Sequence, residues 1–206
     1  METSDSTVRA VLSELVHGAM QRSPMRASPF TQSYLVAVLL EFVRSDPARL
    51  GLLLGVESVK AAALPPVLRY RRLKEIADTS LFLSGVFADY VETSSTGSAW
   101  YRTIGARAYL DLGGLRRRLV PAEPAVSAPA DVFAETYNHL GRHFEEFASV
   151  LTTVADRELF PAHRRILALY QRWLETRSDR QRRRLINLGV SLGTSRSEGD
   201  DPSCPN

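Results

Sequence analysis

Cysteine and lysine are nearly missing from this 206-residue chain. Its one cysteine, Cys204, excludes an internal disulfide within these residues and leaves at most one thiolate for a metal. Only Lys60 and Lys74 are lysines, so arginine carries nearly all the positive charge, and the formal net charge is +3. So small a net charge is weak evidence for nucleic-acid binding. The scarcity of cysteine is typical of proteins in a reducing compartment, and we expect a cytoplasmic location.

Long hydrophobic runs are also missing. The longest stretch without a charged residue, 27–40, has 14 residues, whereas a membrane-spanning helix needs about 20. The first residues, Met-Glu-Thr-Ser-Asp, are acidic and polar, where a secretory signal would have basic residues followed by an apolar segment. We therefore expect no membrane span and no export through a signal peptide.

The chain shows no alternation of apolar and polar residues typical of a half-buried strand. Apolar residues instead recur every three or four positions, which is the period of an α-helix. They predict helices at about 6–21, 31–44, 45–54, 65–91, 100–112, 131–151, 162–175 and 179–188. The fold class we expect is all-α, a single antiparallel bundle of seven or eight helices centred on 34–43 and 73–91.

Proline, glycine and serine divide this bundle from its flanks. Residues 1–30 are predicted to form an amphipathic helix and a connector, and residues 31–189 the bundle, with a mobile linker near 120–130 that holds three prolines. Residues 190–206 consist largely of Ser, Gly, Asp and Pro, with almost nothing to bury. A disordered tail is the expectation for such a composition.

The segment Ala-Asp-Thr-Ser-Leu-Phe-Leu-Ser-Gly-Val-Phe-Ala-Asp-Tyr, at 77–90, resembles a stretch shared by a group of uncharacterised bacterial all-helical proteins. The likeness extends over about 33–189, and the chain departs from the group's pattern at 92–97. This resemblance implies a helical fold and a bacterial source. It implies no chemistry, because the group has no known activity.

Two carboxylates, Asp78 and Asp89, share one face of the helix predicted for this segment. Eleven residues at 1.5 Å each separate them by roughly 16 Å, too far for a shared proton. We expect each to bind an arginine or a helix N-terminus, and Arg71, Arg102 and Arg107 are the candidate partners. On the same helix the small residues Ser80, Ser84 and Ala88 recur every four positions and predict close packing against another helix.

A second hypothesis treats part of this region as a pocket. In it Asp78, Asp89, Tyr101 and Tyr109 would line a ligand-binding or catalytic cavity. The chain has no phosphate-binding glycine loop, nucleophile elbow or dinucleotide fingerprint, which favours a non-enzymatic protein. Helical enzymes without short motifs exist, so the question of an activity stays open.

A polar stripe with two histidines lies at the edge of the helix predicted over 131–151. Its members are Glu135, His139, His143 and Glu146. Histidines at i and i+4 can chelate a transition metal, so His139 and His143 are a weak metal candidate. A solvated stripe with Glu and His in mutual contact fits the pattern better, and we expect no metal and no cofactor.

Arginines crowd the C-terminal pair of predicted helices, with eight of them between positions 164 and 184. Arg180, Arg183 and Arg184 share one helical face, and Arg164 and Arg165 lie on the preceding helix. Our first hypothesis is a non-enzymatic interaction or regulatory module that binds a protein partner through these arginines. The alternatives are nucleic-acid binding through the same residues, a small-molecule or metal-binding helical protein, and a merely solvated face.

Overall fold

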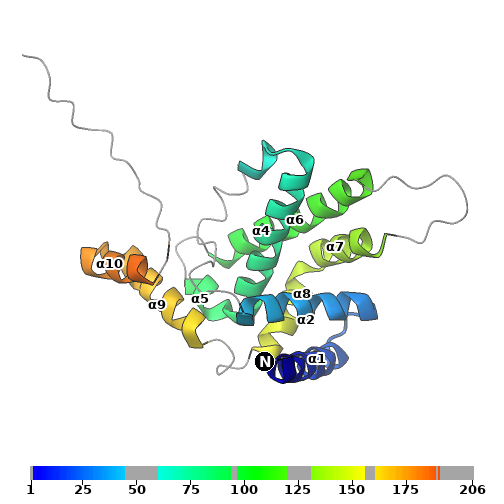
Figure 1. Ribbon diagram of the computed structural model, residues 1–206, viewed down its shortest axis with the longest axis horizontal. Helices are drawn as coiled ribbons and strands as arrows, with labels where there is room; N and C mark the ends of the chain where they lie inside the picture. The colour runs from blue at the N-terminus through cyan, green and yellow to red at the C-terminus, as the bar shows by residue number, and fades with distance from the viewer. Residues whose placement is uncertain are drawn as a thin grey trace, which may run out of the picture.

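The computed structural model describes residues 2–44, 60–93, 97–119, 131–155, 161–188 and 190. Every regular element in these ranges is a helix, which confirms the all-α fold (Figure 1). In chain order the helices are α1 (Glu2–Arg22), α2 (Pro29–Arg44), α4 (Pro66–Val86), α5 (Ala88–Thr93), α6 (Ser98–Leu119), α7 (Val132–Arg142), α8 (Phe144–Val154), α9 (Pro161–Thr176) and α10 (Asp179–Asn187). The helix expected at 45–54, the linker near 120–130 and all of the predicted tail 190–206 except Val190 lie outside the described residues; Val190 is buried, so the prediction of a disordered tail from 190 was wrong for this residue.

Two helices that the sequence predicts as continuous are each divided. Phe87 separates α4 from α5 and His143 separates α7 from α8, and both residues have φ near −120° (−123° and −118°) and ψ of 39°. The prediction of unbroken helices was wrong because these breaks redirect the apolar stripe: α7 packs on α6, whereas α8 packs on α4 and α1. The described ranges hold nine helices, and all but the six-residue α5 have nine residues or more, in agreement with the expected seven or eight.

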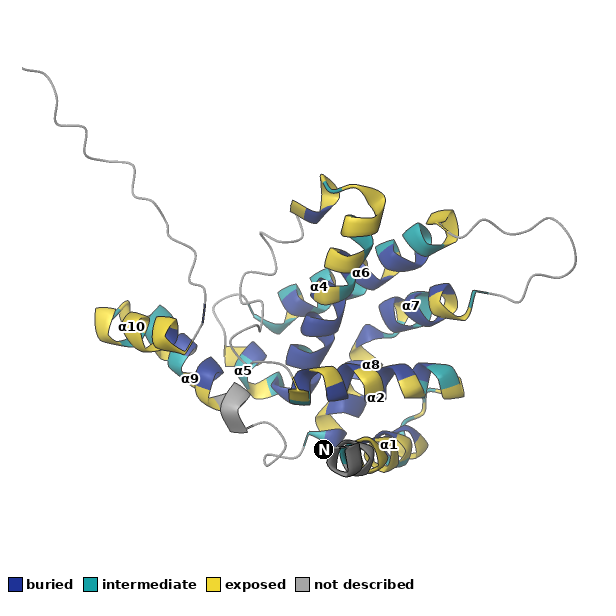
Figure 2. Cartoon of the chain, viewed as in Figure 1, coloured by how far each residue is buried: buried dark blue, intermediate teal, exposed yellow. Residues whose placement is uncertain are grey.

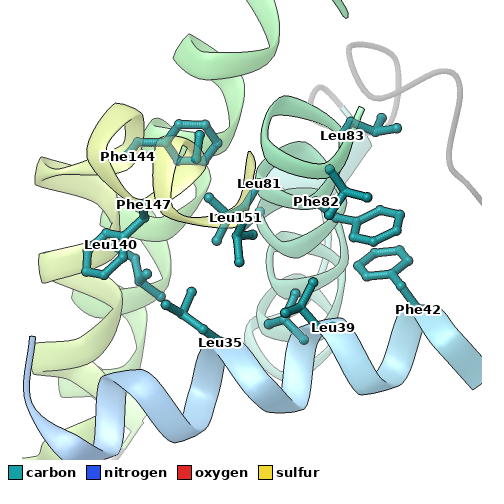
Figure 3. Packing of buried hydrophobic residues seen from close by; sticks show 14 of the residues in the cluster. Leu35, Leu39, Phe42, Leu81, Phe82, Leu83, Leu140, Phe144, Phe147 and Leu151 are labelled. Atoms are coloured by element: carbon teal, nitrogen blue, oxygen red, sulfur yellow. The ribbon is translucent and has the colours of Figure 1, made fainter. Parts of the chain in front are cut away.

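The centre of the bundle is formed by α2 and α4, as the apolar pattern predicts. The rings of Phe42 and Phe82 stack with centroids 4.0 Å apart, and Leu35 and Leu39 extend from the same face of α2 (Figure 3). Around them lie Leu81, Leu140, Phe144, Phe147 and Leu151, all buried. Figure 2 shows this buried centre ringed by exposed outer faces.

One aromatic residue in the first turn of α7 lies at the surface. Phe133 is 41% exposed. Its ring contacts Phe30 edge-on at 4.9 Å, and the guanidinium of Arg116 lies over its other side at 5.3 Å from the centroid. The position next to the N-cap Asp131 leaves Phe133 at the end of the bundle, where no further helix of the described chain covers it.

Glycines set how closely the central helices approach. A Cβ added at Gly105 of α6 would lie 2.4 Å from the Phe144 ring and 2.7 Å from the Cβ of Ser80. One added at Gly85 of α4 would lie 2.4 Å from the Cβ of Leu151. Ser80 is fully buried at this contact, as the small-residue ridge predicts, but Ser84 and Ala88 are only partly buried and line a surface cleft, and Ala88 lies beyond the break, on α5. The contacts at Gly85 and Gly105 leave no room for a side chain larger than hydrogen.

The C-terminal helices α9 and α10 form a hairpin with its own small core. Ile166, Tyr170, Leu185 and Val190 are buried together, separately from the main cluster. Tyr90 of α5 packs against both cores and links the hairpin to the bundle. In Figure 1 the hairpin extends to one side, and Figure 2 shows α10 largely exposed.

No helix among the described residues combines the length and the apolar character that crossing a bilayer requires. The uncharged segment at 27–40 falls in the connector after α1 and in α2, whose buried residues face other helices of the bundle.

Replacing Gly105 by alanine should destabilise the fold, and replacing Gly114 on the same helix should not. Gly105→Ala forces a methyl group into Phe144 and Ser80, and overpacking of this kind costs about 1–3 kcal/mol. Gly114 has no atom within 4 Å of the added Cβ, so Gly114→Ala should raise the free energy of unfolding by about 0.5–1 kcal/mol. Urea denaturation of both variants measures the difference, and equal free energies would contradict the packing described here.

Candidate functional site

The buried polar centre of the protein is Asp78. Its Oδ1 accepts hydrogen bonds from the phenols of Tyr34 in α2 and Tyr109 in α6, each at 2.7 Å. Its Oδ2 pairs with Lys74 Nζ at 2.5 Å, one turn earlier on α4. The prediction that an arginine partners this aspartate was wrong: the partners are a lysine and two tyrosines.

A second layer of polar side chains surrounds this centre. Lys74 also lies 3.6 Å from Glu41 Oε2, and its ammonium sits 5.6 Å from the centroid of the Tyr34 ring. The hydroxyls of Tyr70 and Tyr137 are 2.8 Å apart, and the Tyr137 ring packs edge-on against Tyr34 at 5.6 Å. The cluster thus ties α2, α4, α6 and α7 together with its polar groups satisfied.

The titration behaviour of the cluster follows from burial and from the charge of Asp78. Burial raises the pKa of the Tyr34 and Tyr109 phenols far above the usual value, and the neighbouring carboxylate raises it further. Burial alone would lower the pKa of Lys74, but the attraction of Asp78 and Glu41 outweighs it and the pKa is raised. The phenols therefore remain protonated donors and Lys74 remains a cation.

The centre of this cluster is buried, whereas Lys74 and Glu41 at its edge are partly exposed, with side-chain exposures of 34% and 66%. Asp78 is 4% exposed and Tyr109 is fully buried. Three of the surface clefts, of about 370, 770 and 390 Å³, are lined by other residues. With both oxygens of Asp78 hydrogen-bonded or paired, the cluster joins α2, α4 and α6.

The structure separates the four residues of the hypothesised pocket. Asp78 and Tyr109 are in contact, but Asp89 is exposed on α5, beyond the break at Phe87. Tyr101 lies at the junction with the hairpin, where it hydrogen-bonds to Tyr90 and lies close to Tyr170. Burial raises the pKa of Tyr90 above its usual value, with Tyr101 and Tyr170 as further contributors.

The histidine stripe spans the break between α7 and α8. The rings of His139 and His143 stand perpendicular with centroids 5.1 Å apart, and His143 Nδ1 lies 3.3 Å from Glu146 Oε1. Glu135 is exposed, one turn before His139. Among the described side chains no group of three His, Cys, Asp or Glu has the arrangement of a metal site.

The predicted site residues on the arginine-rich hairpin form an exposed, positively charged surface. Arg180, Arg183 and Arg184 are exposed on α10, and Arg165 is exposed on α9; the side chain of Arg164 lies outside the described residues. Ile186 and Leu188, 46% and 42% exposed, lie beside the arginines of α10. The hairpin therefore combines cationic and apolar groups on one surface.

The turn between α9 and α10 is made by Arg177, whose φ of 50° lies in the left-handed region. Glycine is the usual residue there, because a Cβ makes the conformation costly. Two contacts offset the cost: the Arg177 amide donates to the Trp173 carbonyl at 2.7 Å, and the guanidinium lies 5.1 Å from the centroid of the Trp173 ring.

Comparison with protein-family models, with curated proteins and with solved structures gave no match to the chain. The likeness of residues 77–90 to a bacterial helical group therefore stays a prediction.

Two direct partners of Asp78, Lys74 and Tyr34, were not among the site residues that the sequence predicts. The spacing of Lys74 and Asp78 signals an i, i+4 ion pair and would have identified the lysine. Nothing in the pattern of α2 distinguishes Tyr34 from an ordinary core aromatic, because its partner lies 44 residues away.

Removing the charge of Asp78 should destabilise the whole bundle. Asp78→Asn keeps one acceptor oxygen but turns an amide toward Lys74 and removes the ion pair, so we expect the free energy of unfolding to fall by about 3 kcal/mol. Asp89→Asn, on the exposed α5, is the matched control and should change it by less than about 0.5 kcal/mol. Guanidinium denaturation measures the free energy of unfolding of both variants. A loss for Asp78→Asn as small as that for Asp89→Asn would contradict the central role of Asp78.

The folded protein should lose stability in mild acid through His139. Burial lowers the pKa of His139 below the usual 6.5, and the neighbouring His143 and Arg142 lower it further. The unfolded chain therefore takes up a proton first as the pH falls. The contribution of His139 is complete above pH 6.5 and is lost as the pH drops from 6.5 through the lower folded pKa.

His139→Gln should flatten this pH dependence. Unfolding free energies of wild type and variant, measured in urea at intervals between pH 8 and pH 5, test it. Parallel curves over that range would show that His139 does not carry the effect.

Proposed function

We propose that this chain is a non-enzymatic cytoplasmic interaction module that binds an acidic protein partner through the α9–α10 hairpin. The observation that carries the proposal is the joint exposure of arginines and aliphatic side chains on one short helix, α10. Residues 161–188 contain eight arginines against two acidic residues, Glu175 and Asp179. Protein interfaces are enriched in arginine and in apolar contacts, which matches this surface.

The arginines of α10 keep their charge available for a partner. No carboxylate of the described residues lies within 4 Å of the guanidinium groups of Arg180, Arg183 or Arg184. Some arginines elsewhere on the surface are paired, as Arg107 is with Asp111 and Arg116 with Asp131. A partner rich in carboxylates would provide the neutralisation that no carboxylate of the described residues gives to these arginines.

The buried cluster supports the non-enzymatic part of the proposal. Its buried carboxylate, Asp78, is bonded by three donors, and the phenols of Tyr34 and Tyr109 hold their protons because burial raises their pKa. A general acid or base needs access to its substrate. Asp78 and Tyr109 are buried without such access, which favours a function at the surface.

Reversing three charges on α10 should abolish partner binding. The variant Arg180→Glu/Arg183→Glu/Arg184→Glu alters exposed residues only, and we expect at least a tenfold loss of the partner that wild type enriches from its native cell extract. Arg71→Glu/Arg117→Glu/Arg118→Glu makes the same change in net charge on α4 and α6 and serves as control. Quantitative mass spectrometry after nuclease treatment measures the recovery, and equal recovery by the two variants would refute the hairpin as the contact surface.

Nucleic-acid binding is a second candidate, favoured by the arginine excess of the same hairpin. It predicts retention of a 24-base-pair DNA duplex at 50 mM salt and its loss by about 200 mM, because phosphate contacts release counterions. The exposed Ile186 and Leu188 favour protein over phosphate, since apolar side chains gain nothing from a sugar–phosphate backbone. An electrophoretic mobility shift assay at the two salt concentrations tests whether the hairpin binds nucleic acid.

A further inference from the structure

A groove of about 370 Å³ runs between α9 and α10. The residues that line the groove are spaced at i, i+3, i+4 and i+7 on α9 and at i, i+3 and i+4 on α10. Residues with this spacing lie on one face of a helix, so each helix lines the groove with a single face. The lining residues are Arg165, Ala168, Leu169 and Arg172 from α9 and Arg184, Asn187 and Leu188 from α10. The groove thus lies within the surface to which partner binding is assigned.

The groove is lined by both apolar and cationic side chains. Ala168, Leu169 and Leu188 supply apolar surface, whereas Arg165, Arg172 and Arg184 supply guanidinium groups. None of these three arginines has a carboxylate of the described chain within ion-pair distance. An occupant that satisfies both parts carries an apolar side chain flanked by carboxylates.

The volume and the charge point to a segment of protein. A cavity of about 150 Å³ accommodates benzene, so this groove has space for a leucine or phenylalanine side chain. A phosphate group would satisfy the arginines but would leave Leu169 and Leu188 without a partner. An acidic amphipathic helix presents an apolar residue with acidic residues one turn away on either side. This pattern matches a groove lined by three arginines and three apolar side chains.

We propose that the α9–α10 groove receives a leucine-type side chain from an acidic helical segment of the partner, whose carboxylates pair with Arg165, Arg172 and Arg184. This rests on the proposed function, since it specifies what the arginine surface binds. The apolar contact gives the preference for one acidic segment over another, and the charges give attraction to all of them.

Two synthetic peptides of equal charge test the groove. One is a fluorescein-labelled, glutamate-rich helix with leucines at i and i+4, and the other has both leucines replaced by serine. Fluorescence anisotropy with the full-length protein should give at least tenfold tighter binding of the leucine peptide. Ala168→Trp, which fills the groove from an exposed position, and Leu188→Ser should each weaken leucine-peptide binding at least fivefold and leave serine-peptide binding unchanged.

Control variants separate the groove from general charge. Val67→Ser removes an apolar side chain that is 59% exposed on α4 and should change neither affinity. Arg172→Gln/Arg184→Gln should weaken both peptides. Circular dichroism of each variant confirms that the helices are retained.

The outcomes distinguish this inference from the proposed function. Equal binding of the two peptides, both lost in Arg172→Gln/Arg184→Gln, would leave the arginine surface as a partner site and overturn the groove. Binding of neither peptide by wild type, tighter binding of duplex DNA than of the leucine peptide, or dimerisation lost in Ala168→Trp would also overturn it. Partner recovery by the charge-reversed α10 variant tests the proposed function independently.

Discussion

The buried charge of Asp78 governs the interior formed by the described helices. Placing the carboxylate of Asp78 away from water costs several kcal/mol unless its oxygens are compensated, and the fold meets that requirement from three helices. Tyr34 and Tyr109 approach one oxygen and Lys74 the other. The arrangement of α2, α4 and α6 is therefore set by hydrogen-bond geometry as well as by apolar packing, since a displaced helix would leave a buried oxygen unpaired.

Close backbone approach makes that geometry attainable. Gly105 lets α6 lie against Ser80 of α4 and Phe144 of α8, and Gly85 brings α8 against α4. The breaks at Phe87 and His143 then turn α5 and α8 out of the directions of the preceding helices. The result is a tightly packed bundle whose polar centre joins α2, α4, α6 and α7 through hydrogen bonds and an ion pair.

The fold class and the central helices could be predicted from the sequence because they depend on the local period of apolar residues, as in α2 and α4. The breaks could not, since Phe87 and His143 are neither glycine nor proline and the cause is packing against distant helices. The same holds for Asp78: its neighbour Lys74 is signalled by spacing, but Tyr34 and Tyr109 lie 44 and 31 residues away. The arginine face of α10 follows from helical geometry alone, whereas the groove beside it requires the turn at Arg177.

The hairpin differs from the bundle in how its charges are treated. In the bundle Asp131 both caps α7, accepting from the amides of Phe133 and Ala134, and pairs with Arg116 at 2.8 Å, so one carboxylate serves two needs. In the hairpin, acidic residues are few and the arginines of α10 stand beside exposed aliphatic side chains. Like charges along one short helix repel one another, a cost that a few carboxylates would remove. Because carboxylates are scarce in the hairpin, its arginines lack counter-charges while its exposed aliphatic side chains lack apolar contacts. One acidic, leucine-bearing segment would supply both.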